Sequence, residues 1–349
     1  MPSITDFTCP LPRLDYDTIQ LAHGSGGRLS AELIDKLFLP RFANPILNRL
    51  EDQATLQMPP GRLAMTTDSF VVSPIFFPGG DIGDLAINGT VNDLAMGGAT
   101  PLYLSVAFIL EEGLPIADLH RILLSMEKSA ATAGIQVVTG DTKVVNKGAC
   151  DQIFINTTGI GVIESGIALS AANIRPGDKI IVSGTIADHG MAILTCRENL
   201  SFHSRINSDS AALNSLVKEM LEVSKEIHAL RDPTRGGLAT TLNEFAASSG
   251  VGILLEEKAI PVRAEVRGAC EVMGIDPLYV ANEGKLVAAV PPDQAERVLN
   301  AMRCHPLGSE AQIIGTAVAE HPRLVTIKTA LGAERIVAMP VGEQLPRIC

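Results

Sequence analysis

Four aspartates that lie far apart in the chain have the side chain and the local setting of metal ligands. Each lies where an apolar element begins or ends, or interrupts an apolar helix face; they are Asp52, Asp68, Asp93 and Asp141. Mg²⁺ takes oxygen ligands and commonly bridges a few carboxylates to nucleotide phosphates. A single aspartate of this kind is more often a cap or turn residue, but Asp93 lies within an expected helix, where a cap has no use. As a set they predict a site for magnesium and ATP.

A glycine-rich segment near the N-terminus has the composition of a phosphate-binding loop. It consists of His23, Gly24, Ser25, Gly26 and Gly27, and it precedes a helical stretch. Its exposed backbone N–H groups suit phosphate oxygens. Because the segment matches neither GxxxxGK[ST] nor GxGxxG, it is neither a P-loop nor a dinucleotide fingerprint. Alone it is weak evidence, and it supports a nucleotide site only beside the aspartates.

Two segments in the second half of the chain have both a functional and a structural interpretation. The run 231–237 is expected to end one helix and open another, which places the Arg235 guanidinium beside a helix N-terminus and suits an anion. Asp232 or Thr234 as a helix cap fits the spacing equally well. Glu283 precedes an apolar strand, where it is either a functional tip or a plain turn residue.

The C-terminal residue, Cys349, differs from the other five cysteines. None of the six belongs to a CxxC pair or to a zinc-like Cys/His spacing. Five are expected to be small apolar core residues; they are Cys9, Cys150, Cys196, Cys270 and Cys304. Cys349 follows Pro346, Arg347 and Ile348 at the end of the chain, where no core is expected to enclose its thiol.

Length and composition limit the class of protein. A chain of 349 residues fits two domains, and 46% apolar with 19% charged residues is typical of a globular protein. The formal net charge of −11, without a run of basic residues, argues against nucleic-acid binding. The N-terminal residues carry several acidic groups and no apolar stretch long enough for a signal peptide or a membrane span. We therefore expect a cytoplasmic protein with no membrane or nucleic-acid partner.

Hydrophobic periodicity predicts an α/β fold of mixed sheets in two domains. The first domain is expected to form one mixed layer with helices on one side: strands at 62–72, 102–110, 136–145 and 152–163, helices at 82–97 and 116–132. A small, polar stretch after Ser165 suits a linker. The second domain is expected to contain strands at 179–185, 252–257, 285–290 and 312–319, helices at 188–197, 210–229, from 236, 262–273 and 293–303, and a closing hairpin at 323–338. Strict βαβ alternation is absent, which excludes a Rossmann or barrel pattern.

Taken together, these motifs resemble the HypE family of hydrogenase maturation proteins. The resemblance runs from about Ile19 to Cys349 and is carried by HGSGG, EDQA, TTDSF, FFPGGDIGDLAINGTVNDLAMGGATP, ILEEGLP, VTGDTKVV, DPTRGG, ANEGKL and the terminal PRIC. The pairing of GDTKVV with that terminus is its most specific element. It implies the two-domain α/β fold shared with aminoimidazole ribonucleotide synthetase, selenophosphate synthetase and thiamine monophosphate kinase, which usually dimerises through first-domain strands. The implied division is an N-terminal extension (1–18), an ATP-binding and dimerisation domain (19–168), a second α/β domain (169–339) and a mobile tail (340–349).

The resemblance also implies a reaction and its partners. A HypF-type carbamoyltransferase would place a carbamoyl group on the Cys349 sulfur, and ATP-dependent dehydration would convert it to a thiocyanate. The nitrile would then pass to iron on a HypC–HypD complex as the cyanide ligand of a nickel–iron hydrogenase. A free-substrate synthetase or kinase of the same superfamily, and a non-enzymatic scaffold whose tail docks to a partner, are the alternatives.

Residue roles follow from the same resemblance. The four aspartates would hold Mg²⁺ against the phosphates, with the loop 23–27, Asn92 and Thr142 at the nucleotide. Glu283 would accept an N–H proton from the carboxamide, Lys143 would polarise the group or relay a proton, and Arg235 would steady the transferred phosphoryl group. Two departures limit the match: residues 1–18, with Cys9, lie outside it, and Glu51 stands where some relatives have aspartate.

Overall fold

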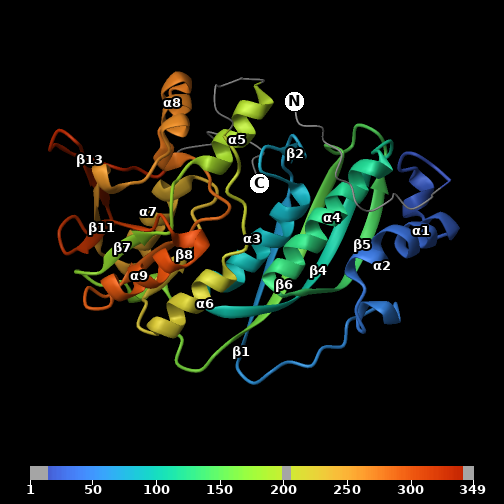
Figure 1. Ribbon diagram of the computed structural model, residues 1–349, viewed down its shortest axis with the longest axis horizontal. Helices are drawn as coiled ribbons and strands as arrows, with labels where there is room; N and C mark the ends of the chain where they lie inside the picture. The colour runs from blue at the N-terminus through green and yellow to red at the C-terminus, as the bar shows by residue number, and fades with distance from the viewer. Residues whose placement is uncertain (1–14, 199–205, 341–349) are drawn as a thin grey trace.

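The first domain is a four-stranded sheet covered on one face by helices (Figure 1). The computed structural model describes residues 15–198 and 206–340. The strand order is β1-β6-β4-β5, antiparallel except where β4 and β5 run parallel and α4 makes the crossover between them. The elements are β1 (Arg62–Phe70), α3 (Ile82–Met96), β4 (Ala99–Glu111), α4 (Ile116–Ala133), β5 (Gln136–Val145) and β6 (Ile153–Ile163).

The two faces of this sheet differ because side chains alternate along a strand. In β4, Leu104, Val106 and Phe108 are buried in a core shared with α3 and α4. No helix within residues 15–198 and 206–340 covers the opposite face, and in β1 that face leaves Leu63 64% and Met65 73% exposed. A sheet face with exposed apolar side chains is suited to contact with another protein surface.

Helix α3 is buried almost all round, between the sheet and the second domain. Its first turn is capped by Asp81, whose carboxylate accepts the N–H groups of Gly83 and Asp84, while Asp84 accepts the N–H of Asp81. Apolar residues on every side are typical of an interior helix. A helix so enclosed fixes the position of any functional group that it carries.

The second domain is a seven-stranded sheet with helices on both faces. Alternate residues of β7 enter different cores: Ile180 and Val182 pack with α7, whereas Ile181 packs with α6 and α9. The strand order is β13-β12-β9-β11-β7-β10-β8. The elements are β7 (Lys179–Val182), α5 (Asp188–Arg197), α6 (Asn214–Val223), β8 (Ala229–Arg231), α7 (Gly237–Ser249), β9 (Gly252–Glu256), α8 (Ala264–Met273), β10 (Val287–Val290), α9 (Ala295–Cys304), β11 (Gln312–Val318), β12 (Val325–Lys328) and β13 (Glu334–Ile336).

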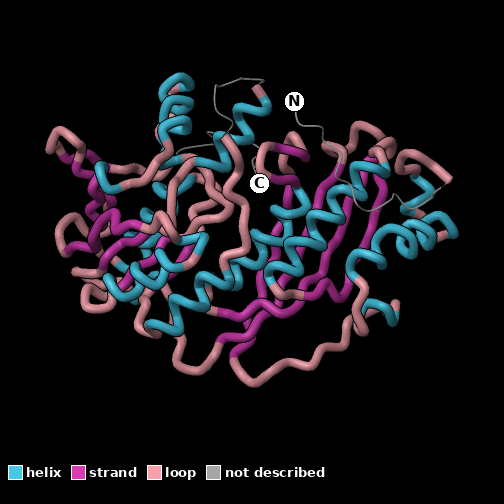
Figure 2. Tube along the Cα trace, in the orientation of Figure 1, coloured by secondary structure: helices cyan, strands magenta, loops and turns pink. Residues whose placement is uncertain are grey.

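Most predicted elements are confirmed, but the helix predicted at 210–229 is wrong at both ends. Residues 206–213 have no regular structure and lead into α6 beside the first domain (Figure 2). Residues 229–231 form β8, which pairs with β10. Helix α7 begins where it was expected, with Gly236 at φ 77° as its N-cap, but a strand and not a helix precedes it. Neither Asp232 nor Thr234 is therefore the helix cap.

Two further observations complete the fold. Within residues 15–198 and 206–340, no helix is both long and apolar enough to span a bilayer. Cys270 is buried as expected, but Cys304 is exposed at the end of α9, so the prediction that it is a core residue is wrong. Cys9 and Cys349 lie outside the described residues.

Candidate functional site between the two domains

The first domain contributes two carboxylates to the boundary between the domains. Asp68 lies in β1 two residues after Thr66, so both side chains lie on the face of the sheet covered by α3. Thr66 donates its hydroxyl to Asp93 Oδ2 of α3 over 2.7 Å. Burial and then the charge of Asp93 raise the pKa of Asp68 to about 6, although Arg235 partly opposes them. Two neighbouring carboxylates whose mutual repulsion Arg235 offsets only in part suit a divalent metal ion.

The second domain adds Asp232 and Glu283 to the same cluster. Burial and then Asp93 raise the pKa of Asp232 to about 7. Burial, followed by Asp232, Asp209 and Asp68, raises the pKa of Glu283 well above its usual value, and Arg235 acts in the opposite direction. Four residues that were predicted from the sequence therefore lie close together: Asp68, Asp93, Arg235 and Glu283.

The side chain of Glu283 is buried, and its hydrogen-bonding capacity is not fully used within the described residues. It is 3% exposed, and its Oε1 atom has no hydrogen-bond partner among residues 15–198 and 206–340. A buried polar atom without a partner is costly in a fold, and such atoms occur at functional sites. A carboxyl group whose proton affinity is raised by burial is also a stronger base once it is ionised.

Asn92 has a structural role that the sequence did not reveal. Its amide donates to the carbonyl oxygens of Ala211 and Glu283, over 3.0 and 3.3 Å, and its Oδ1 accepts the N–H of Leu213. The side chain is 1% exposed. These bonds join α3 to the second domain, and the nucleotide contact expected at Asn92 stays a prediction.

A separate cavity of about 680 Å³ lies at the other edge of the first domain. It is bounded by β5 and by the N-terminal helices α1 (Arg28–Leu33) and α2 (Leu39–Phe42), which a π-helical turn joins. One wall is apolar, with Leu33, Phe38 and Phe108, and another is polar. The polar wall contains the predicted residues His23, Gly24, Ser25, Gly26, Asp141, Thr142 and Lys143. A cavity with one apolar and one polar wall, of this size, suits a nucleotide.

The glycine segment is shaped by its own contacts. A Cβ atom at Gly24 would lie 2.6 Å from the backbone nitrogen of Val144, so only glycine allows this approach to β5. Gly26 has φ 76°, and its N–H donates to Ser30 Oγ. The buried ring of His23 accepts the N–H of Gln20, and burial lowers its pKa, which favours neutral imidazole. Gly27 begins the short helix α1 as its N-cap.

Asp141 and Lys143 form an exposed pair on β5. The Lys143 ammonium lies 2.7 Å from the Asp141 carboxylate. This contact, more than the N–H of Thr142, lowers the pKa of Asp141 below its usual value. Neither residue lies at Glu283, so the expectation that Lys143 and Glu283 surround one carboxamide is not met within a single chain.

The four predicted aspartates do not converge within one chain. Asp68 and Asp141 lie in the two edge strands, three strand spacings or about 14 Å apart. Asp52 is exposed in the segment before β1, where its neighbours Glu51 and Gln53 line the cavity. Among the described residues, no group of three or more His, Cys, Asp or Glu side chains is placed to hold a metal ion. Within one chain they form two separate groups, Asp68 with Asp93 and Asp141 with Asp52 nearby, which we call half-sites; one metal site of all four aspartates stays a prediction.

Two carboxylates near Glu283 were not predicted from the sequence as part of the site. Asp232 fitted the spacing as one of two possible helix caps, and no role at the site was predicted for it. Asp209 directly precedes the helix that was predicted at 210–229, where nothing in the sequence indicated a role. Asp209 lies in an irregular segment that is hydrogen-bonded to the first domain, whereas Asp232 lies in a loop that Asn282 holds through the carbonyl oxygen of Pro233.

Comparison with known proteins places the chain in a family. The models of the N-terminal and C-terminal domains of AIR synthase related proteins match residues 50–163 and 175–327. The carbamoyl dehydratase HypE of Azotobacter vinelandii is 57% identical over 97% of this chain and 100% of its own length. The chain belongs to the HypE family. Its HypE relative from Escherichia coli K12 is 49% identical over 95% of this chain and 100% of its own.

Solved structures agree with this membership. A HypE crystal structure in complex with ATP has a TM-score of 0.92 and 53% identity, covering 95% of this chain and 100% of that one. A HypE–HypF complex has a TM-score of 0.78 and 50% identity, covering 90% of this chain and 100% of that one. Thiamine monophosphate kinase from Aquifex aeolicus, at 22% identity and a TM-score of 0.56, shares the fold.

Proposed function

We propose that this chain is an ATP-dependent carbamoyl dehydratase that converts an S-carbamoyl group on its own Cys349 into a thiocyanate. The observation that carries this proposal is Glu283: a buried carboxyl group with a free oxygen, surrounded by carboxylates, in a member of the HypE family. Hydrogenase maturation is the process that the product serves, as the source of the cyanide ligand of the nickel–iron site. We expect the reaction to take place in the cytoplasm.

The reaction balances without an oxidant. Transfer of the γ-phosphoryl group of ATP to the carbamoyl oxygen turns that oxygen into part of a leaving group. Loss of two N–H protons and breakage of the carbon–oxygen bond then give ADP, phosphate and a nitrile carbon bonded to the Cys349 sulfur. Glu283 accepts an N–H proton, and its raised proton affinity suits that step.

Positive groups serve the phosphoryl transfer. Arg235, which already interacts with the carboxyl groups of Asp68 and Glu283, is placed to steady the transferred phosphoryl group. Lys143 lies in the wall of the nucleotide cavity and can polarise the carbamoyl group or relay a proton. Both functions require the two half-sites to be close together.

Magnesium fits the donor set at each half-site. Asp68 and Asp93 are oxygen ligands whose mutual repulsion a cation would relieve, and Asp141, with Asp52 nearby, adds carboxylates at the nucleotide cavity. When bound, the ion would neutralise charge on the phosphates during transfer. The loop 23–27 and Thr142 would contact the nucleotide in the same cavity.

A homodimer would unite the half-sites. Asp68 pairs with Thr157, Thr157 with Val106, and Val106 with Gly140, so Asp68 and Asp141 lie at one level on opposite edges. Two sheets packed through their exposed faces about a two-fold axis parallel to the strands would bring β1 of each chain beside β5 of the other. This contact would also bury Leu63 and Met65.

Loss of a metal ligand should stop ATP turnover while sparing the fold. We expect Asp93→Asn and Asp141→Asn each to lose most phosphate release, because charge neutralisation on the phosphates contributes to rate rather than to folding. Phosphate release and calorimetric unfolding measure the two effects. Asp293→Asn, an exposed aspartate in the second domain, is the matched control. Normal turnover in both active-site variants would refute the metal assignment.

The dimer makes a distinct prediction about mixed subunits. In a hybrid of one Asp93→Asn chain and one Asp141→Asn chain, one composite site is intact and the other is doubly damaged. Random mixing therefore restores about a quarter of wild-type turnover, since half of the dimers are hybrids. Light scattering should give a dimer mass at micromolar concentration. A monomer mass, or no recovery in confirmed hybrids, would contradict the composite site.

Two partner classes complete the proposed sequence. A HypF-type carbamoyltransferase supplies the carbamoyl group, and the relative seen in a HypE–HypF complex supports that partner. A HypC–HypD complex with bound iron accepts the nitrile carbon. Both need access to the sulfur of Cys349, which must therefore leave the site after dehydration.

A further inference from the structure

Glu283 depends on its backbone for its position, because its side chain has little to anchor it. Oε1 has no hydrogen-bond partner within the described ranges. The preceding residue is well anchored: Asn282 donates its backbone N–H and its side-chain amide to the carbonyl oxygen of Pro233, over 3.1 and 2.9 Å. It also accepts the N–H of Ala187 at the start of α5. The position of the Glu283 carboxyl group therefore depends on the position of the backbone of residues 282–284.

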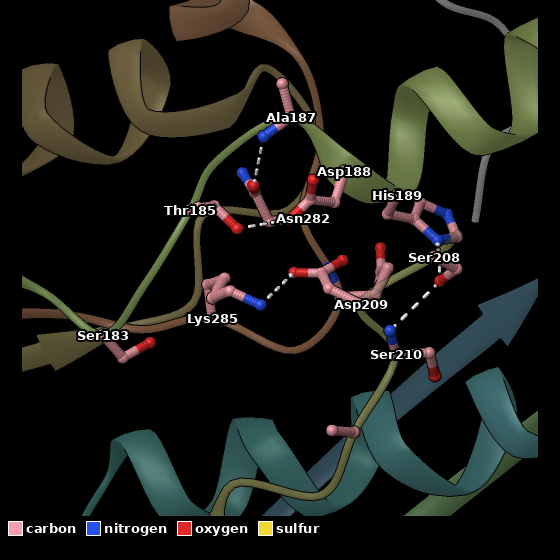
Figure 3. Close-up of polar contacts among 12 residues, drawn as sticks. Ser183, Thr185, Ala187, Asp188, His189, Ser208, Asp209, Ser210, Asn282 and Lys285 are labelled. Atoms are coloured by element: carbon pink, nitrogen blue, oxygen red, sulfur yellow. Dashed lines mark hydrogen bonds and ion pairs between the residues drawn. The ribbon is translucent and has the colours of Figure 1, made fainter. Parts of the chain in front are cut away.

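Asp209 is the anchor on the other side of this loop. Its Oδ1 accepts the backbone N–H of Glu283 over 3.1 Å. Its Oδ2 lies 3.2 Å from the ammonium of Lys285 (Figure 3). The side chains are only 3% and 12% exposed. A Cβ atom at Gly284 would lie 1.7 Å from the carbonyl oxygen of Asp209, so glycine is required for the contact. Burial acts to raise the pKa of Asp209, but Lys285 and His189 outweigh it and hold that pKa below its usual value.

The segment that carries Asp209 is tied to the first domain on both sides of that residue. The N–H of Ser208 donates to the carbonyl oxygen of Pro78 over 2.8 Å. Ser210 donates its hydroxyl to Asp84 Oδ1 over 2.7 Å and accepts from the Asn88 amide. Asp84 and Asn88 belong to α3, the helix that also carries Asp93. Asp209 is thus held in a fixed relation to the first-domain carboxylates.

We propose that Asp209, held in place by Lys285, is a positioning residue that sets Glu283 at the correct distance from the carboxylates of the first domain. The inference rests on the proposed role of Glu283 as the proton acceptor. Asp209 lies at the centre of segment 206–213 and acts through one hydrogen bond, which it accepts from the Glu283 N–H. Displacement of a reacting group by about 1 Å can cost about 100-fold in rate.

The surroundings of Lys285 favour this role over ligand binding. A cavity of about 270 Å³ borders Lys285, Asp209 and Arg263. Its two cations already face carboxylates: Lys285 faces Asp209, and Arg263 Nε lies 3.7 Å from Asp188 Oδ1. The positive charge is therefore matched within the protein.

The test compares two double variants that remove the ion pair as a unit. Removing one partner alone would leave an unpaired buried charge and destabilise the fold for that reason. Asp209→Asn/Lys285→Met keeps a side-chain carbonyl that accepts the Glu283 N–H. Asp209→Leu/Lys285→Met has a similar shape and no acceptor, and Asp209→Ala/Lys285→Met serves in its place if leucine does not fit. Lys179→Met, a partly buried lysine bonded to Thr316, is the control for loss of a lysine.

We expect the asparagine pair to keep kcat for dehydration within about threefold of wild type, and the leucine pair to lose about 100-fold. The KM for ATP should change little in either, since neither residue lines the nucleotide cavity. Hydrogen exchange at the Glu283 amide should be protected in the asparagine pair and fast in the leucine pair. Thermal midpoints of the two variants should agree within a few degrees.

Equal kcat values in the two double variants, or equal protection of the Glu283 amide, would overturn the proposal. A kcat loss in the leucine pair matched by a rise in KM for ATP and a fall in thermal midpoint would also overturn it, because that is the pattern of general damage. The exchange measurement does not depend on the reaction. If wild-type protein formed no thiocyanate, the proposed function would fail while the exchange result still decided the positioning role.

Discussion

Replacement of Cys349 by serine is expected to abolish thiocyanate formation and to leave folding and ATP binding close to wild type. The sulfur atom is the one that must carry the carbamoyl group, and a hydroxyl group is a much weaker nucleophile toward a carbamoyl donor. No core is expected to enclose a thiol at the end of the chain. Thiocyanate formation should therefore be lost completely, while the stability of the fold changes little.

Mass spectrometry of the C-terminal peptide measures this effect directly. The wild-type peptide, after incubation with a carbamoyl donor system and ATP, should first gain the mass of a carbamoyl group and then lose the mass of water. Cys304→Ser is the matched control, because Cys304 is an exposed thiol on α9 and should have no role. A carbamoyl adduct on any other cysteine, or thiocyanate formed by Cys349→Ser, would contradict the central assignment.

Glu283→Gln is expected to stop dehydration after carbamoylation. Loss of a general base typically costs about 10²–10⁴ in rate. The S-carbamoyl form of Cys349 should therefore accumulate in the presence of ATP, instead of the thiocyanate. Glu296→Gln, an exposed change on α9, controls for loss of a carboxylate. Rapid conversion of the carbamoyl peptide in Glu283→Gln would remove Glu283 from the reaction.

Stability of the same variant separates a chemical from a structural effect. The folded-state pKa of Glu283 is raised above its unfolded value, so the folded state binds a proton that the unfolded state releases. Its contribution to stability is full below the unfolded pKa, about 4.5, and is lost as pH rises through the folded pKa. At pH 8 the thermal midpoint of Glu283→Gln should therefore equal or exceed that of wild type. A large fall would show that the carboxylate supports the fold.

Local sequence patterns predicted the helices and strands well, because these elements form through interactions between residues that are close in the chain. The alternation in β4 and the apolar pattern of α4 are properties of short stretches, and both elements lie where they were expected. The interior position of Asp93 in α3 was also predictable, since a carboxylate within an apolar helix has no use as a cap. Gly26 and Asp141 line one cavity although they are 115 positions apart in the chain, and no local pattern predicts that they meet.

The sequence by itself determined the two α/β domains, the family motifs, the acidic residues suited to metal and nucleotide, and a terminal thiol free of any predicted element. The tertiary structure decided which of these residues meet. It placed Asp68 and Asp93 beside Asp232 and Glu283, it left Asp141 at the opposite edge of the sheet, and it gave Asn92 a structural role. Segment 206–213 shows the physical reason. Its path is fixed by hydrogen bonds to α3, more than 100 residues earlier in the chain, and no local pattern of hydrophobicity encodes such contacts.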